Sequence, residues 1–346
     1  MVKRFCRFGL LFVFFLLTSA CTNVAISPPI SPSTLNPQGP AAAHLAQLWW
    51  VMFGIGTVIF LLVIGLLFAA ILRGRRAADD TPPDVRNGDL GRTWPILGGI
   101  LMPLIVLGVV FGYNVYTLAR VENPSAKPAV KIEVVGRRWW WEVKYPDDGV
   151  VTANEIHIPV GQPVEIKLQT ADVIHSFWVP ELHGKMDLIP HRINKIVIQA
   201  DKAGVFRGEC AEFCGLQHAH MGFMVVAESQ ADFDQWKEAQ SQPAADPADP
   251  AAQQGQQVFM SNCVFCHTVR GLDDKEIDRS GIDLGPDLTH LDSRLTIAGA
   301  SLEKNRGNLA GWILDAQHVK PGTLMPNLHM NSEDLQALLA YLESLH

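Results

Sequence analysis

Two long apolar runs without charge limit what this sequence can fold into more than any other feature. The runs Trp49–Leu72 and Trp94–Leu118 contain no Asp, Glu, Lys, Arg or His. An α-helix rises about 1.5 Å per residue, so each run can cross the ~30 Å hydrocarbon core of a bilayer. Trp49 and Trp94 stand at the ends of the runs, where amphipathic rings favour the membrane interface. The sequence therefore predicts two transmembrane helices, over 49–72 and 94–118, the second kinked at Pro103.

Charged residues around the two runs predict their orientation. The connection between the runs holds arginines at 73, 75, 76, 86 and 92, whereas residues 22–48 hold neither Lys nor Arg. Cytoplasmic loops are enriched in Lys and Arg, so we expect the connection in the cytoplasm and both flanking ends on the outer side. Because the runs lack side chains that could ligate haem or relay protons, we expect them to anchor the chain and to pack against partner helices.

The first 21 residues are typical of a secretory signal peptide. A basic start with Lys3 and Arg4 precedes a short apolar run at 10–17, which cannot span a membrane. Cys21 follows small residues, as in a lipoprotein cleavage box, so it could be acylated. Ordinary signal cleavage nearby, with Cys21 carrying no chemistry, is the alternative. The polar, Pro-rich segment 22–48 is expected to stay extended on the outer side.

Beyond the membrane runs, residues 131–227 alternate between apolar and polar side chains with period two, which is typical of half-buried strands. Strands are expected at 131–134, 141–145, 164–168 and 196–198. About a hundred residues of short strands favour a β-sandwich or barrel, closed by an amphipathic helix at about 231–240. Residues 241–254, rich in Pro, Ala and Gln, are expected to form a flexible linker. The remainder, 255–346, is expected to be mostly helical.

The segment Cys210–Met221 holds a dense set of metal-binding side chains. Its cysteines, a histidine and a methionine follow a C-x3-C-x3-H-x2-M spacing, and such soft ligands suit copper or zinc. His175, in an upstream loop, can supply a second imidazole. Two thiolates on one loop could bridge two metal ions, with Met221 and a backbone carbonyl as weak ligands, which favours an electron-transfer centre. A structural zinc site built on the two cysteines and two histidines is the alternative.

A second metal-binding pattern lies in the C-terminal part. Cys263-Val264-Phe265-Cys266-His267 is the C-x-x-C-H attachment motif of c-type haem, in which both thiols bond the haem and the histidine lies under the iron. A redox dithiol or half of a zinc site is the alternative for the pentapeptide alone. Met325 is expected as the sixth iron ligand. His318, His329 and Met330 are the alternatives to it.

With these motifs in place, residues 44–240 resemble subunit II of haem–copper cytochrome oxidase, and residues 253–346 resemble a class I cytochrome c. The resemblance implies a multidomain membrane protein with a transmembrane hairpin, an all-β cupredoxin-like Greek-key domain at 121–240 and an all-α cytochrome c domain at 255–346. It implies two copper ions (a CuA centre), one covalently bound haem c and an interfacial Mg²⁺. The copper ligands carried over from the family are His175, Cys210, the backbone oxygen of Glu212, Cys214, His218 and Met221.

The resemblance also assigns roles to residues outside the copper set. The side chain of Glu212 is expected to reach Mg²⁺ at the interface with subunit I. Trp139–Trp141 matches an aromatic motif of the family, in which Trp139 receives the electron from cytochrome c. A barrel core or a membrane-facing belt is the alternative for these rings. Gly91 stands where the family often has a glutamate at the mouth of a proton path, and Asp89 is the nearest acid.

These observations predict the electron-input subunit of a respiratory terminal oxidase of the caa type. Electrons from cytochrome c would pass through haem c and CuA to a haem–copper subunit that reduces O₂ to water. The expected partners are subunit I, other oxidase subunits, a cytochrome c or similar donor and the membrane; the net charge of −7 gives no indication of nucleic acid. The expected location is the bacterial plasma membrane, with the C-terminal domains on the periplasmic face. An electron-input subunit of a nitric oxide reductase and a membrane-tethered carrier without an enzyme partner are the alternatives.

Overall fold

The computed structural model describes residues 32–74, 89–122, 127–272 and 285–346. The predicted signal peptide, the acylation of Cys21 and the arginines at 75, 76 and 86 lie outside the described residues. All described residues belong to one compact unit, Pro32–His346.

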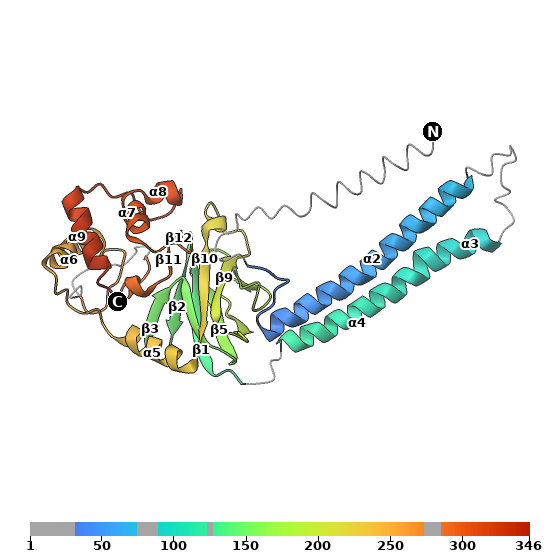
Figure 1. Cartoon of the computed structure of the whole chain (residues 1–346), viewed down its shortest axis with the longest axis horizontal. Helices are drawn as coiled ribbons and strands as arrows, with labels where there is room; N and C mark the ends of the chain where they lie inside the picture. The colour runs from blue at the N-terminus through green and yellow to red at the C-terminus, as the bar shows by residue number, and fades with distance from the viewer. Residues whose placement is uncertain (1–31, 75–88, 123–126, 273–284) are drawn as a thin grey trace. The chain divides into compact units, whose positions relative to one another are not determined.

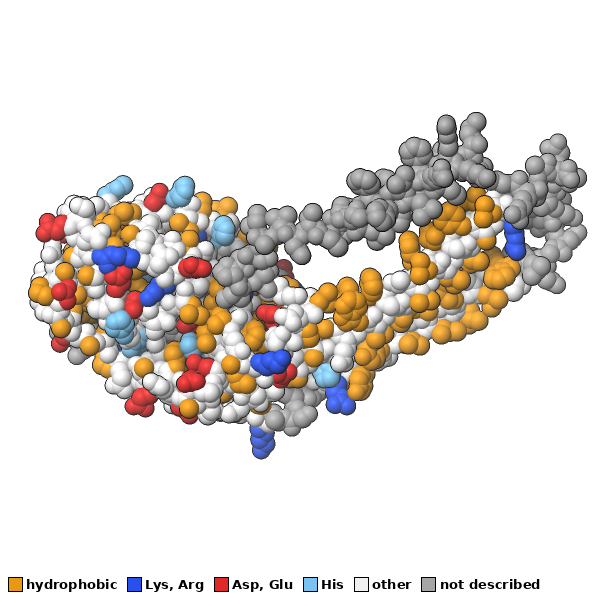
Figure 2. Space-filling view, viewed as in Figure 1, with side chains coloured by type: hydrophobic (Ala, Val, Ile, Leu, Met, Phe, Trp, Pro, Cys, Tyr) orange, Lys and Arg blue, Asp and Glu red, His pale blue; other side chains and the backbone are white. Residues whose placement is uncertain are grey.

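Two helical segments are long and apolar enough to cross a membrane, as the sequence predicts. The first is α2 (Pro40–Gly74). The second combines α3 (Asp89–Ile96), the π-helix η1 (Leu97–Leu101) and α4 (Met102–Glu122). Helices α2 and α4 pack side by side (Figure 1), and hydrophobic side chains cover both of them in Figure 2. Exposed apolar surface of this extent is the surface that lipid covers.

The first of these helices begins earlier than predicted. Residues 40–48, expected to be extended, form the first turns of α2. The reason is local, since Pro40 suits the first position of a helix and Ala41–Ala43 have the highest helix propensity. Just before it, Gln38 N donates to Glu181 O (2.7 Å) and Ala42 N to Leu182 O (3.2 Å). These bonds join the helix start to the β-domain.

The irregularity at Pro103 takes the form of a π-helix. Proline has no N–H, so Pro103 cannot donate to the carbonyl of Gly99 four residues earlier. The wider π-turns of η1 occupy Leu97–Leu101, and α-helical bonding resumes with α4. The predicted kink site is therefore the end of a π-segment rather than a simple bend.

The central domain is a β-sandwich of two five-stranded sheets, in agreement with the predicted fold class. In strand order, the first sheet contains β3 (Val150–Ala153), β2 (Trp140–Tyr145), β1 (Val130–Arg137), β5 (Val164–Thr170) and β8 (Asn194–Ile198). The second contains β4 (Glu155–Pro159), β10 (Gly222–Glu228), β9 (Gly204–Cys210), β6 (His175–Trp178) and β7 (Met186–Leu188). Pairs β1–β5 and β4–β10 are parallel and the other pairs within the two sheets are antiparallel. The chain passes between the sheets repeatedly, because β5 and β8 of the first sheet alternate along the sequence with strands of the second.

The alternation noticed in the sequence accounts for the core between the sheets. In β1, Ile132 and Val134 are fully buried, whereas Glu133 between them is partly exposed. Trp141, Phe177 and Phe223 meet at the centre, with ring centroids 4.6 to 6.0 Å apart. Aromatic pairs at these spacings add to the burial of apolar area. The predicted closing helix is α5 (Gln230–Ser241), whose Phe233 is fully buried against this domain.

The C-terminal domain is helical, as predicted, with one small departure. Its helices are α6 (Pro250–Asn262), α7 (Arg306–Leu314), α8 (Ala316–Val319) and α9 (Ser332–Leu342). A two-stranded hairpin of β11 (Thr296–Ile297) and β12 (Leu302–Glu303) interrupts the expected all-α pattern. The end of the predicted linker is also helical. Asp249 caps α6 by accepting from Ala252 N (3.2 Å), and Pro250 occupies the first turn.

Helices α6 and α9 cross at unusually close range. A Cβ on Gly255 would lie 1.9 Å from Ala337 O and 2.8 Å from the Cβ of Tyr341. Only glycine allows the two backbones to approach in this way. Phe259 of α6 and Tyr341 of α9 are both buried in the resulting core. The crossing holds the start of the C-x-x-C-H motif, which follows α6 directly.

Candidate metal centres

The predicted metal ligands of the central domain come from two neighbouring strands. Strand β6 begins at His175, and β9 ends at Cys210. These strands pair in antiparallel register with Phe177 opposite Cys210. The pairing brings the fully buried His175 ring to the cysteine, with Nδ1 3.9 Å from Sγ.

The loop after β9 adds the other predicted donors around the Cys214 thiol. Its Sγ lies 3.8 Å from Cys210 Sγ, 3.7 Å from His218 Nδ1 and 3.7 Å from Met221 Sδ. The backbone oxygen of Glu212 lies 3.2 Å from Cys210 Sγ. A disulfide would need about 2.05 Å, so the two sulfurs are separate thiols. All six donor atoms predicted from the sequence therefore form one connected cluster.

The pKa values of the two thiols shift in opposite directions. A hydrogen bond from Cys214 lowers the pKa of Cys210, and this effect outweighs the burial that opposes it. The same interaction, together with burial, raises the pKa of Cys214. A single thiolate, that of Cys210, is therefore favoured in a cluster that also contains two imidazoles and a thioether. This soft donor set fits copper and excludes a hard oxygen-preferring cation.

Asp172 orients the His175 ring and was missed by sequence reasoning. Its Oδ1 lies 2.8 Å from His175 Nε2, so Nε2–H donates to the carboxylate and Nδ1 faces the sulfurs. Burial opposes ionisation of Asp172, but bonds from His175 and from the backbone N–H groups of Arg138 and Val173 prevail and lower its pKa to about 2. Carboxylates commonly orient ligating histidines in this way. The i, i+3 spacing before His175 was the available signal.

The three adjacent tryptophans have different environments. Trp141 is fully buried between the sheets, so the core alternative applies to this ring. Trp139 is 8% exposed and donates from Nε1 to Cys214 O at 3.0 Å. Trp140 is half-buried and lines a cavity of the C-terminal domain. Trp139 therefore contacts the cysteine loop directly.

Other predicted positions are also accounted for. The Glu212 side chain is 45% exposed, and its carboxylate lies 3.3 Å from Lys185 Nζ. His157 lies between Glu228 Oε1 (2.8 Å) and Glu155 Oε1 (3.0 Å) and takes no part in the donor cluster. Burial lowers the pKa of His157, but the two carboxylates overcome this and leave it raised.

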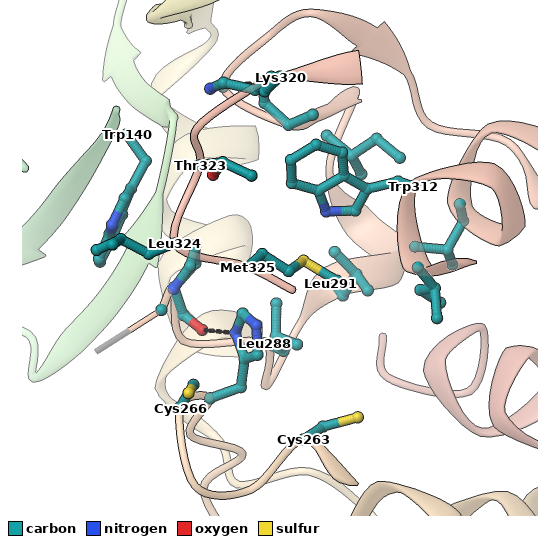
Figure 3. A pocket seen from close by; sticks show the side chains of 18 of the residues that line it. Trp140, Cys263, Cys266, Leu288, Leu291, Trp312, Lys320, Thr323, Leu324 and Met325 are labelled. Carbon is teal, nitrogen blue, oxygen red and sulfur yellow. Dashed lines mark hydrogen bonds between the residues drawn. The ribbon is translucent and has the colours of Figure 1, made fainter. Parts of the chain in front are cut away.

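The C-x-x-C-H motif and Met325 line one cavity of the C-terminal domain. Cys266 N and His267 N both donate to Cys263 O (3.1 and 3.0 Å), which folds the motif into a tight turn at the cavity wall. Figure 3 shows Met325 across the cavity from Cys263 and Cys266, with Leu288, Leu291 and Trp312 between and beside them. The alternative ligands His318, His329 and Met330 do not line this cavity in the described part of the chain.

The His267 ring is held in one orientation. Its Nδ1 lies 2.8 Å from Pro286 O, to which it donates, so Nε2 is left with a free lone pair. Burial in the cavity wall lowers the pKa of His267 and favours the neutral ring. A Cβ at Gly285 would lie 2.5 Å from the ring, so glycine is required beside it. An apolar cavity with two thiols, an oriented imidazole and a thioether fits a covalently attached haem.

Comparisons with known proteins agree with this division of the chain. Residues 150–229 match the family model of the cytochrome c oxidase subunit II periplasmic domain, and residues 252–346 match that of cytochrome c. Cytochrome c oxidase subunit 2 of Alkalihalophilus pseudofirmus is 35% identical over 318 residues, 90% of each chain. The protein of the same name from Bacillus subtilis is 31% identical over 366 residues, 100% of this chain and 99% of the relative. The solved periplasmic domain of subunit II of cytochrome oxidase from Bradyrhizobium japonicum is 30% identical, with a TM-score of 0.33, over 33% of this chain and 95% of that one.

Proposed function

Because the chain belongs to the cytochrome c oxidase subunit 2 family, we propose that it is the electron-input subunit of a haem–copper oxidase with a fused cytochrome c domain. Electrons from a cytochrome c or a similar donor reach the chain at its C-terminal domain and leave it through the central domain. The oxygen-reducing site belongs to another subunit, because the apolar runs 49–72 and 94–118 of the described membrane helices carry no histidine with which to ligate haem or copper. His44, near the start of α2, precedes the apolar run.

The observation that carries the proposal is the single cluster of six donors. His175, Cys210 and Cys214 offer ligand atoms within 4.8 Å of one another, and His218, Met221 and the Glu212 carbonyl adjoin them. We infer that these six donors would hold a pair of copper ions, which would supply one-electron chemistry. A zinc site would leave the Met221 sulfur without a role, since structural zinc takes four nitrogen or thiolate ligands.

The haem assignment follows the same reasoning. Cys263 and Cys266 would bond a haem covalently, and His267, through Nε2, and Met325 would hold its iron. When bound, the copper pair and the haem supply reversible one-electron chemistry. The protein holds their ligands in fixed orientations, so little rearrangement accompanies a change of charge.

Two further assignments concern the residue where electrons would enter the copper loop and the residue that would face subunit I. Trp139 is the aromatic contact through which electrons enter the copper loop, because its indole bonds Cys214 O. The exposed Glu212 carboxylate is placed to bind Mg²⁺ at an interface with subunit I. Both depend on partners: a catalytic subunit on one side, and a donor cytochrome on the other.

The membrane arrangement completes the proposal. The two apolar helices anchor the chain in a bacterial plasma membrane, with both soluble domains on the periplasmic face. The names of the relatives favour an oxidase over a nitric oxide reductase or a carrier without a partner. Oxygen uptake by the complex purified in mild detergent, with its large subunit identified, separates these three.

Electron paramagnetic resonance tests the copper assignment. The full chain should show one unpaired electron shared by two copper nuclei, together with one covalent haem. Cys214→Ser should abolish the copper signal and keep the haem spectrum, whereas Cys266→Ser should weaken haem attachment and keep the copper signal. A single-copper or zinc-only centre in the unmodified chain would overturn the assignment.

A further inference from the structure

Lys320 of the C-terminal domain is buried against the central domain. Only 3% of its surface is exposed. Its Nζ donates to Trp139 O at 2.8 Å and to Ala298 O at 3.2 Å. Lysine is almost never buried without partners, because its ammonium group loses hydration. Here both partners are backbone carbonyls, one from each domain, and Figure 3 shows Lys320 at the edge of the haem cavity.

The turn of the β11–β12 hairpin makes a second contact with the central domain. Gly299 O accepts from Gly222 N (2.9 Å), and Ala300 O accepts from Arg207 Nη1 (2.8 Å). Gly222 directly follows Met221, a proposed copper ligand. A Cβ at Gly299 would lie 2.9 Å from Lys320 Nζ and 3.2 Å from Trp139 O. The turn therefore fits closely between the lysine and the copper loop.

The backbone of this turn is strained. Ala298 and Ala300 have φ of 55°, and Gly299 between them has φ of 67°. Left-handed conformations disfavour residues with a Cβ, so two such alanines persist only where the surroundings hold them. The bonds to Lys320, Gly222 and Arg207 are the contacts that hold them.

A third contact links the proposed iron ligand to a proposed copper ligand. Gln217 Nε2 donates to Pro321 O at 2.7 Å. Gln217 is the residue before His218, and Pro321 leads through a short loop to Met325. A Cβ at Gly322 in that loop would lie 2.9 Å from Leu216 Cδ1. The same loop thus contacts the copper loop at one end and the haem cavity at the other.

We propose that Lys320, Pro321 and the Ala298–Ala300 turn form a docking latch that holds the cytochrome domain on the copper loop in one orientation. The residues of the latch are positioning residues for electron transfer within the chain, so the inference rests on the proposed function. The start of the linker also contacts the cytochrome domain, since Ala244 N donates to Arg270 O (2.8 Å), and Glu155 of β4 accepts from Leu295 N (2.9 Å). The latch adds the contacts that are made at the copper loop itself.

Hydrogen exchange of Gly222 tests the latch directly in the full chain. Its N–H bonds Gly299 O across the interface, so opening the latch exposes it. Lys320→Met keeps the length of the side chain and removes the donor; Arg207→Met removes the bond to Ala300 O from the other domain. Each should speed exchange of a peptide containing Gly222 at least ten-fold. Each should also slow reduction of copper after rapid photoreduction of the haem at least ten-fold.

Lys304→Met is the matched control, because Lys304 Nζ bonds only Asp292 within its own domain (2.6 Å to the backbone oxygen). It should leave both measurements unchanged. If Lys320→Met lost its haem, Arg207→Met would decide, since it lies in β9 and leaves the cytochrome domain intact. Unchanged exchange of Gly222 in Arg207→Met would overturn the latch. Missing copper or haem signals in the unmodified chain would overturn the proposed function instead, and Gly222 exchange would still decide the latch.

Discussion

Replacing Gly255 by alanine should destabilise the cytochrome domain strongly. The added Cβ would lie 1.9 Å from Ala337 O, about 1.4 Å inside an ordinary C···O contact of ~3.3 Å. The obstacle is the backbone of α9, which cannot rotate away as a side chain could, so the two helices must separate. Overpacking of a core costs about 1–3 kcal/mol, and a clash with backbone belongs at the upper end, about 3 kcal/mol.

The loss of stability in Gly255→Ala can be measured as a fall in the melting temperature of the cytochrome domain. For a domain of this size, 1 kcal/mol shifts the midpoint by about 4–8 °C, so Gly255→Ala should lower the cytochrome-domain transition by roughly 12–24 °C. Differential scanning calorimetry of the haem-loaded chain, with haem absorbance followed in parallel, assigns the transition to this domain. Separation of α6 from α9 should also perturb the haem spectrum, because Cys263 follows α6.

Gly311 offers a matched control of opposite sign. It lies inside α7, and a Cβ there would meet no atom within 4 Å. Alanine has the better helix propensity by about 1 kcal/mol, so Gly311→Ala should raise the same transition. A drop of less than about 4 °C in Gly255→Ala would refute the claim that the crossing requires glycine. Equal drops in both variants would mean that neither helix behaves as described.

Three further changes test the sites. Asp172→Asn should weaken copper binding about 10–100-fold by loosening the His175 ring; competition against a chelator measures it, and unchanged affinity would deny Asp172 its orienting role. The carboxylates around His157 overcome the effect of burial and raise its pKa above the usual 6.5. Their stabilisation is therefore complete below that pH and is lost as the pH rises through the folded pKa. Urea unfolding between pH 6 and pH 9 should show this fall, and His157→Gln should flatten it; a fall of the same size in the variant would assign it elsewhere. Met325→His should lower the haem midpoint potential in a redox titration, since methionine ligation raises it, and an unchanged potential would exclude Met325 as the ligand.

Much of the central domain was predictable because its signals are local. Alternation places Ile132, Val134 and Trp141 on the buried face with no knowledge of their partners. The spacing from Cys210 to Met221 likewise keeps five of the six donors on one loop, counting the backbone oxygen of Glu212. Only His175 had to be brought from another strand, and a two-sheet domain makes that pairing natural.

The features that escaped prediction are those that depend on contacts distant in sequence. From the sequence, Lys320 looks like an ordinary surface lysine. Its burial follows from a hydrogen bond that its Nζ donates to the backbone oxygen of Trp139, far earlier in the chain. The β11–β12 hairpin is too short to produce an alternating pattern, and its left-handed alanines follow from docking. The early start of α2 was a different case: residues 22–48 were expected to be extended, although a proline such as Pro40 suits the first position of a helix.

The register of β6 against β9 has a consequence for the order of assembly. His175 and Cys210 become neighbours only when Phe177 lies opposite Cys210, and a slip of one residue would turn the histidine to the other face of the sheet. An unfolded chain therefore has no complete copper site, and the free energy of metal binding adds to the stability of the paired sheet. Loading of the proposed copper site must therefore follow folding, so a chain with misregistered strands stays unmetallated and can be told apart from a correctly folded one.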